Sequence, residues 1–144
     1  MKPFRVLSPL HKASRQVQIR MHSRCRPLGV STLQAHLIGY CSTKGPRPIS
    51  ELHRVLGQNK STLTAVLDRL ESRKLTIRKL NPKDRRSWLI ELTPKGEALA
   101  GKLRKEYEAF EELVIKRIRP QDMAGFEAVM NAIDDVTNIT LAPA

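Results

Sequence analysis

Two adjacent arginines, Arg85 and Arg86, are the residues of this sequence whose type and position most clearly suggest chemistry. They belong to the segment NPKDRRSWLIELT (residues 81–93), in which an Asn81-Pro82 turn signal leads into a run of alternating apolar residues. Two guanidinium groups at the tip of a hairpin repel each other and add nothing to a core. Their presence therefore indicates a contact outside the chain.

The excess of positive charge lies in one part of the chain. The formal net charge is +12, from 26 Lys and Arg against 14 Asp and Glu. Residues 1–86 hold 19 basic and 4 acidic side chains, whereas residues 87–144 hold 7 basic and 10 acidic ones. This distribution favours a surface that faces a polyanion, most commonly nucleic acid, over charge that serves solubility alone.

Several absences narrow the functional class. No window approaches 18 consecutive apolar residues, and the N-terminal segment lacks the apolar centre of a secretory signal. Nucleophile elbows, phosphate-binding glycine loops and zinc-protease patterns are absent as well, so we do not expect an enzyme. We expect a cytoplasmic, reduced protein without a membrane partner, a cofactor or a metal.

The cysteines and histidines carry weaker hypotheses. Cys25 lies between Arg24 and Arg26, which lower a thiol pKa, so it is a candidate redox switch. It also falls on an apolar helical stripe, where a cysteine more often serves packing. His22 and His36 are positioned to meet between the first two predicted helices, but acidic residues are nearly absent before residue 68, which argues against a metal sensor.

Periodicity defines the elements that position the two arginines. An apolar stripe predicts a helix that starts at Ser8-Pro9, with the serine as N-cap, and ends at Pro27 and Gly29. A second helix starts near Ser31, and residues 43–48 (TKGPRP) read as a loop.

Two short amphipathic helices follow, separated by a tight turn. Ser50 is the expected N-cap of the first, Gly57 breaks it, and Asn59 is the expected N-cap of the second. The second helix repeats apolar residues at helical spacing, at Leu63, Val66, Leu67 and Leu70. This is a helix-turn-helix layout.

The periodicity then changes to two. Runs over residues 75–79 and 88–92 alternate around the Asn81-Pro82 turn and predict a β-hairpin. Thr93-Pro94 caps a long helix, and Pro120 opens a last one. Apolar stripes over residues 99–114 and 126–136 favour a homodimer interface over an intramolecular helix pair, because a small chain with six helices leaves apolar surface that needs a partner.

A helix-turn-helix followed by a hairpin is a winged helix, in which the second helix enters the major groove by its N-terminal end. Arg85 or Arg86 then lies in the neighbouring minor groove, and Asp84 holds one guanidinium through a charge-assisted hydrogen bond. The residues expected to contact DNA are Lys60, Ser61, Thr62, Thr64, Ala65, Arg69, Arg73, Lys83, Asp84, Arg85 and Arg86.

Residues 31–97 resemble the MarR family of bacterial winged-helix transcription regulators. NKSTLTAVLDRLESRKL (59–75) and NPKDRRSWLIELTPKG (81–96) carry the resemblance. It implies a homodimer with intertwined N- and C-terminal helices, a pseudo-palindromic operator, repression, and release by a small aromatic effector. The recognition residues by position are Lys60, Ser61, Thr62, Thr64 and Ala65, and the wing residues are Asp84, Arg85 and Arg86.

Two departures from the family pattern have local consequences. Arg73-Lys74-Leu75 stands where the family has Arg-Gly-Leu, so either Lys74 adopts a left-handed conformation, at a cost of roughly 1 kcal/mol, or the helix ends differently. Ala65 occupies a position where a longer side chain often reads a base, so sequence preference is modest or rests on contact with a thymine methyl.

These observations predict a mainly α protein with a small β-hairpin wing. Residues 1–30 form an N-terminal dimerisation segment, residues 31–96 a winged helix-turn-helix DNA-binding domain, and residues 97–144 a C-terminal dimerisation segment. The predicted function is sequence-specific binding of double-stranded DNA by a transcriptional regulator, a repressor released by an effector. Two alternatives are a winged-helix protein-interaction module and an architectural DNA binder of low specificity.

Overall fold

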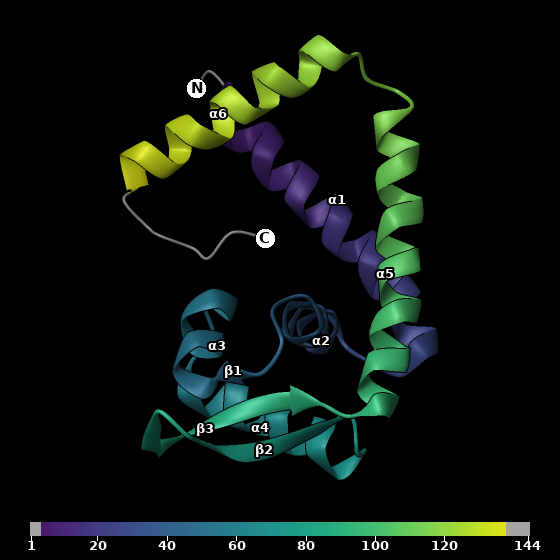
Figure 1. The fold of residues 1–144 in the computed structure, drawn as a ribbon. Helices are drawn as coiled ribbons and strands as arrows, with labels where there is room; N and C mark the ends of the chain where they lie inside the picture. The colour runs from purple at the N-terminus through teal and green to yellow at the C-terminus, as the bar shows by residue number, and fades with distance from the viewer. Residues whose placement is uncertain (1–3, 138–144) are drawn as a thin grey trace. The chain divides into compact units, whose positions relative to one another are not determined.

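The computed structural model describes residues 4–137 and is mainly helical, with one small sheet (Figure 1). The chain divides into two compact units at the Glu106–Tyr107 bond, inside one helix. In the described part of the chain no helix is long and apolar enough to cross a membrane.

The first unit contains the predicted helix-turn-helix and wing. Its elements are α1 (Leu7–Cys25), a 3-10 helix η1 (Arg26–Leu28), α2 (Thr32–Lys44), β1 (Arg47–Pro48), α3 (Ile49–Leu56), α4 (Lys60–Ser72), β2 (Thr76–Asn81), β3 (Asp84–Leu92) and the first part of α5 (Pro94–Ile115). The predicted fold class, a winged helix-turn-helix with a hairpin wing, is confirmed.

The sheet has three antiparallel strands in the order β1-β3-β2. The predicted hairpin is present, and Leu80 pairs with Trp88 and Arg78 with Ile90 across it. The prediction of a loop over residues 43–48 was wrong in two respects. Helix α2 continues to Lys44, and Arg47–Pro48 forms the edge strand β1 against β3. A two-residue strand carries no alternation that periodicity can detect.

The predicted N-caps Asn59 and Thr93 were right, and α2 begins next to Ser31 as predicted. The Ser31 hydroxyl accepts from the Gln34 backbone N–H while the Gln34 side chain accepts from the Ser31 backbone N–H, which is a capping box. Asn59 caps α4 through the Thr62 N–H at 2.8 Å, and the Thr93 hydroxyl caps α5 through the Gly96 N–H at 3.1 Å. Gly57 ends α3 in the left-handed region with φ 60°.

The predicted caps Ser8 and Ser50 were wrong. Helix α1 already begins at Leu7, and α3 begins at Ile49, so each serine lies inside its helix. The N-cap positions are Val6 and Pro48, and neither makes a side-chain capping hydrogen bond. Helix α3 is instead held by the packing of its buried Leu52, because a helix in a protein owes most of its stability to its buried face.

The core of the first unit lies between the sheet and helices α2, α3 and α4. Helix α2 and α3 pack on β3, and α4 packs on β2. The fully buried side chains are almost all aliphatic and lie on α1 to α4 and in or next to the hairpin; the largest are Met21, Leu37, Ile38, Leu52, Leu63, Leu67, Leu70, Leu75 and Ile90. This core fixes the exposed side of α4 relative to the hairpin.

Of the two alternatives that the sequence leaves open at the junction between α4 and β2, the structure has the left-handed residue. Lys74 has φ 57°, the left-handed value, and its carbonyl accepts a hydrogen bond from the Thr93 hydroxyl at 2.7 Å. The Lys95 ammonium donates to the Arg73 carbonyl at 3.0 Å. Two side chains of the segment that follows β3 therefore satisfy carbonyls at the C-terminus of α4 and hold a backbone turn that glycine adopts at lower cost.

The second unit comprises the end of α5 and α6 (Pro120–Thr137). Asp122 receives hydrogen bonds from the Arg119 backbone and guanidinium at the start of α6, which lowers the pKa of its carboxyl. Large apolar side chains of this unit stay exposed, among them Leu113, Val114, Ile115, Phe126, Val129 and Val136.

Candidate nucleic-acid interface

The N-terminal end of α4 is lined by hydroxyls and one cation. Ser61 and Thr64 are exposed, and Lys60 extends from the first turn. The Ser61 hydroxyl donates to the Asn59 side chain at 2.8 Å, and the Thr64 hydroxyl donates to the Lys60 carbonyl at 2.9 Å. Their protons are thus used within the helix, so toward a ligand these oxygens offer acceptor lone pairs and small bulk.

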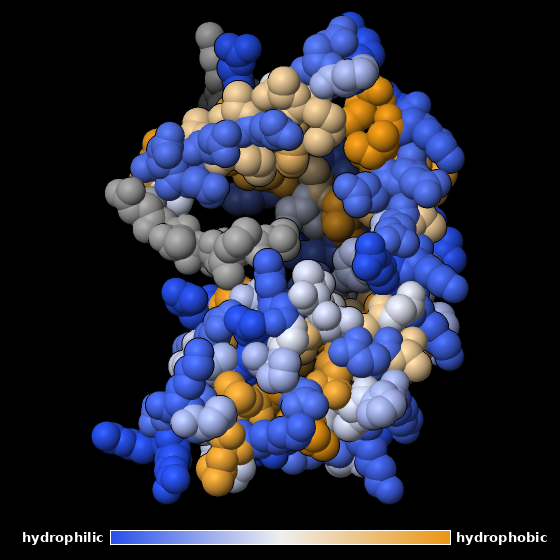
Figure 2. Space-filling model, viewed as in Figure 1, coloured by the Kyte–Doolittle hydropathy of each residue, from blue (hydrophilic) through white to orange (hydrophobic). Residues whose placement is uncertain are grey.

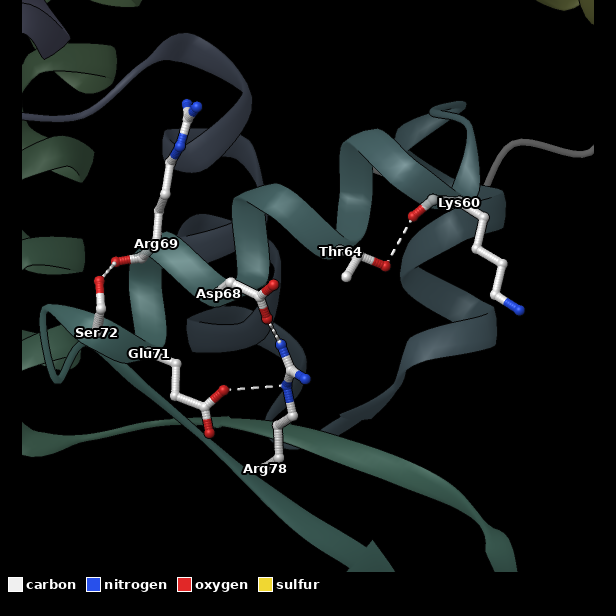
Figure 3. A network of polar contacts seen from close by, with 7 residues as sticks. All are labelled: Lys60, Thr64, Asp68, Arg69, Glu71, Ser72 and Arg78. Carbon is white, nitrogen blue, oxygen red and sulfur yellow. Dashed lines mark hydrogen bonds and ion pairs between the residues drawn. The ribbon is translucent and has the colours of Figure 1, made fainter.

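Ala65 lies next to Thr64 in the first half of α4, whereas Arg69 and Arg73 lie near the far end of the helix. Ala65 is exposed, in keeping with a short side chain on the outer face. Figure 3 shows Arg69 turned to the opposite side of α4 from Asp68 and Glu71. The Arg73 guanidinium donates to the Gly29 carbonyl at 2.5 Å, so it links the end of α4 to the segment after η1.

The tip of the hairpin is held by local side-chain hydrogen bonds. The side-chain oxygen of Asn81 accepts from the Lys83 backbone N–H at 3.0 Å, and the side-chain NH2 of Asn81 donates to the Ser87 hydroxyl at 2.9 Å. The prediction that Asp84 holds a guanidinium was wrong: its carboxylate accepts from the Arg86 backbone N–H at 3.0 Å. Asp84 therefore shapes the turn, as an Asx turn does, and leaves both guanidinium groups unrestrained.

Arg85, Arg86 and Lys83 are exposed at the tip, and none forms an ion pair with a described residue. Hydrophilic side chains surround the hairpin turn in Figure 2. Unpaired arginines at an exposed turn have no intramolecular role that the structure reveals, which agrees with an external anionic partner.

Each acidic residue of the first 86 positions is engaged inside the chain. Glu51 accepts from the Tyr40 hydroxyl at 2.6 Å, which raises the pKa of Tyr40. Asp84 shapes the turn, and Asp68 and Glu71 pair with one arginine. The carboxylates are thereby offset locally, so the positive excess of this region belongs largely to its exposed lysines and arginines.

Arg78 is the site residue that sequence reasoning missed. It reaches from β2 to α4, where its guanidinium binds the Asp68 carboxylate and its Nε lies 3.1 Å from Glu71 Oε2 (Figure 3). The Glu71 contact is an ion pair without an aligned hydrogen bond from Nε. The available signal was the spacing of Asp68 and Glu71, two acids three residues apart on the exposed side of a helix in a strongly basic region.

An open pocket of about 550 Å³ lies between α1, α2 and the end of α3. Both predicted histidines, His22 and His36, line it, together with Arg15, Gln18, Ile19, Thr32, Leu33, Leu56 and Gln58. Burial lowers the pKa of His36. The volume is in the range of small-molecule sites. Among the described residues, no group of three or more His, Cys, Asp and Glu is arranged to hold a metal ion.

Cys25 and Cys41 are buried thiols that do not form a disulfide with each other. Cys25 is inaccessible, and burial raises the pKa of the Cys41 thiol to about 12. Both positions favour packing over the redox role, because a reactive cysteine is accessible and has a lowered pKa.

Comparison with known proteins gives concordant matches. A family model described as MarR family matches residues 28–87. The chain is 26% identical over 98 residues to the HTH-type transcriptional regulator MhqR of Bacillus subtilis (strain 168), covering 68% of each chain.

Solved structures share the fold at low identity. Apo MarR from E. coli matches with a TM-score of 0.77 at 20% identity, over 92% of this chain and 98% of that one. S. aureus MepR in its DNA-binding conformation matches with a TM-score of 0.83 at 17% identity, over 95% and 100%.

Proposed function

We propose that this chain, which belongs to the MarR family of transcriptional regulators, binds a double-stranded operator through the start of α4 and the tip of the β2–β3 wing. One observation carries the proposal. Arg85 and Arg86 project unpaired from a hydrogen-bonded turn, and the same strand pair is tied by Arg78 to the exposed side of α4. The family and the fold are those of regulators, not of enzymes.

The geometry supports contacts of α4 with the major groove and of the wing with the minor groove. The helix start presents Ser61, Thr64 and Ala65, which are small enough for α4 to enter the major groove closely. The wing arginines then reach the minor groove on the other side of a phosphate strand, where a narrow groove has a more negative potential. Lys60 and Lys83 add phosphate contacts.

The operator is expected to be a pseudo-palindrome read by a homodimer. Exposed apolar side chains on α1, among them Leu7, Val17 and Ile19, and those of the second unit supply a surface that dimerisation would cover. Two copies related by a two-fold axis read two half-sites, with centres about one helical turn or a small multiple apart.

Selection from a random duplex pool tests the proposal. A recovered inverted repeat, bound saturably and with an affinity that falls steeply with salt, is the expected result. Recovery of duplexes without a shared motif would instead support the architectural binder, and the small side chain of Ala65 favours that second candidate. Failure of any duplex to bind would favour the protein-interaction module.

A substitution at the wing tests the role of the arginines. Arg86→Ala should weaken operator binding by roughly 1–3 kcal/mol and leave the melting temperature unchanged, because the side chain is exposed and unpaired. Unchanged affinity in a gel-shift titration would remove the wing from the interface.

We also propose repression with release by a small aromatic effector, and the pocket lined by His22, His36 and Arg15 supports this mode. Its basic and apolar lining suits a phenolic or benzoate-type ligand. A panel of such compounds should include one that raises the melting temperature and lowers DNA affinity. Leu33→Trp, which fills the pocket from α2, should abolish that response while DNA binding persists. A wholly negative panel favours a constitutive binder.

A further inference from the structure

Two large apolar side chains are exposed on one face of the wing, next to its tip and outside the core. Leu80 on β2 and Trp88 on β3 face each other across the hairpin, and they are 58% and 46% exposed. The next residue pair on the same face, toward the core, is Arg78 and Ile90, and Ile90 is fully buried. The pair, which we call the wing pair, therefore extends the inner face of the sheet past the edge of its helical cover.

The direction of the wing pair follows from strand alternation. Leu80 lies two residues from Arg78, so the two side chains leave the same face of β2. Arg78 reaches Asp68 and Glu71 on the exposed side of α4 (Figure 3). The wing pair consequently lies on the sheet face that is turned toward the exposed side of α4, the side proposed to meet DNA.

We propose that Leu80 and Trp88 form an apolar contact surface for the deoxyribose edge of the DNA strand that passes between α4 and the wing. The inference rests on the proposed function and adds two apolar side chains to the charged and hydroxyl residues of the proposed interface. The adjoining turn carries Lys83, Arg85 and Arg86, so a phosphate held there places its sugar against the neighbouring apolar surface. Sugar carbons are the apolar component of a duplex backbone, and they are present at every nucleotide.

Such a contact has a definite consequence for recognition. Apolar burial against sugar adds affinity without adding a counterion to be displaced, so it is insensitive to salt. The wing then combines two kinds of contact: arginines, whose contribution falls with salt, and the wing pair, whose contribution remains. Because the positions of the sugars depend on groove shape, the contact made by the wing pair should depend on minor-groove width.

Trp88 is the one tryptophan of the chain, so the native protein carries its own probe. Titration with the selected duplex, about 24 base pairs long, should change Trp88 emission and reduce its quenching by acrylamide at least about twofold. Trp88→Ser should weaken binding of the labelled duplex roughly 10-fold, the factor that about 1.4 kcal/mol of apolar burial supplies. Trp88→Phe should retain most of the affinity.

Ile77 provides the matched control. It lies on β2 one residue from Arg78, on the opposite sheet face, and is 38% exposed. Ile77→Ser should change affinity by less than about twofold, and circular dichroism should show each variant folded. Because the apolar contribution resists salt, the ratio of wild-type to Trp88→Ser affinity should stay constant between low and high salt.

Three results would overturn the inference. In the first, the duplex binds while Trp88 emission and Trp88→Ser affinity stay unchanged; the proposed function then survives and the wing pair does not contribute. In the second, Trp88 responds to protein concentration alone, which identifies a protein interface. In the third, wild-type protein binds no duplex, which defeats the proposed function itself.

Discussion

Replacing Arg78 by leucine should loosen the wing from the recognition helix, because one guanidinium neutralises two carboxylates there. Leucine keeps the apolar bulk on the sheet face and removes the charge. Asp68 and Glu71 then lie on the exposed side of α4 without a counter-charge, beside the proposed path of the phosphates. We expect a small loss of stability and a larger loss of DNA affinity.

The magnitude follows from exposure. The Arg78 side chain is 29% exposed, and those of Asp68 and Glu71 are 58% and 42% exposed, so solvent screens both ion pairs. Exposed pairs contribute about 0.2–1 kcal/mol each, which gives about 1 kcal/mol for the two together. A double-mutant cycle between Arg78→Leu and Asp68→Asn/Glu71→Gln should return a coupling of that size from urea unfolding.

The chain contains a matched control on the other face of the same sheet. Lys79 Nζ lies 2.7 Å from Glu91 Oε2, and this pair has no part in the proposed interface. Lys79→Leu with Glu91→Gln should give a coupling of about 0.5 kcal/mol and leave DNA affinity nearly unchanged.

A rescue experiment separates masking of the acids from a direct phosphate contact. If Arg78 serves to neutralise Asp68 and Glu71, the triple variant Arg78→Leu/Asp68→Asn/Glu71→Gln should recover most of the affinity that Arg78→Leu loses. Fluorescence anisotropy with a labelled duplex measures both. A triple variant that binds as weakly as Arg78→Leu would refute the reasoning and make Arg78 a phosphate ligand.

Three further predictions concern the scaffold. Gly96→Ala should destabilise the protein by about 1–3 kcal/mol in urea unfolding, because its Cβ would lie 2.1 Å from the Leu75 carbonyl oxygen, whereas Gly101→Ala, with nothing within 4 Å, should stabilise it. The Cys41 thiol, with a pKa of about 12, should resist iodoacetamide at about pH 8 until denaturant is added; alkylation of native protein would contradict its burial. Burial lowers the folded-state pKa of His36 below its ordinary value of 6.5, so protons bind the unfolded chain more tightly than the folded one. The contribution of His36 to stability should therefore be complete above pH 6.5 and should fall as the pH drops below it. His36→Gln should flatten this pH dependence of the melting temperature.

Much of the fold can be predicted from short capping, turn and alternation signals in the sequence. The Asn59 cap, the Gly57 turn and the alternation on both sides of Asn81-Pro82 each act over a few residues, so inspection of the sequence finds them. The left-handed Lys74 was one of the two alternatives that such a local signal left open. Strand β1 was not, because its pairing with β3 is set by residues more than forty positions away.

The residues of the candidate site also differ in whether their roles depend on nearby sequence or on distant partners. Arg85 and Arg86 are recognisable because a charged pair at a turn is unusual on its own. The roles of Arg78 and Asp84 depend on partners that only the folded chain supplies: Arg78 finds its acids on another element, and Asp84 binds a backbone N–H in preference to a guanidinium. Residue type alone does not choose between such partners.

The salt dependence of operator binding in a wing variant tests the central claim most directly. Each arginine that displaces a counterion contributes about 0.9 to the slope of log affinity against log salt, so Arg85→Ala/Arg86→Ala should reduce the slope by nearly 2. The charge-matched variant Lys102→Ala/Lys105→Ala, on exposed positions of α5, should leave it unchanged. An equal reduction in both variants, or none in the wing variant, would contradict the assignment of the wing to DNA.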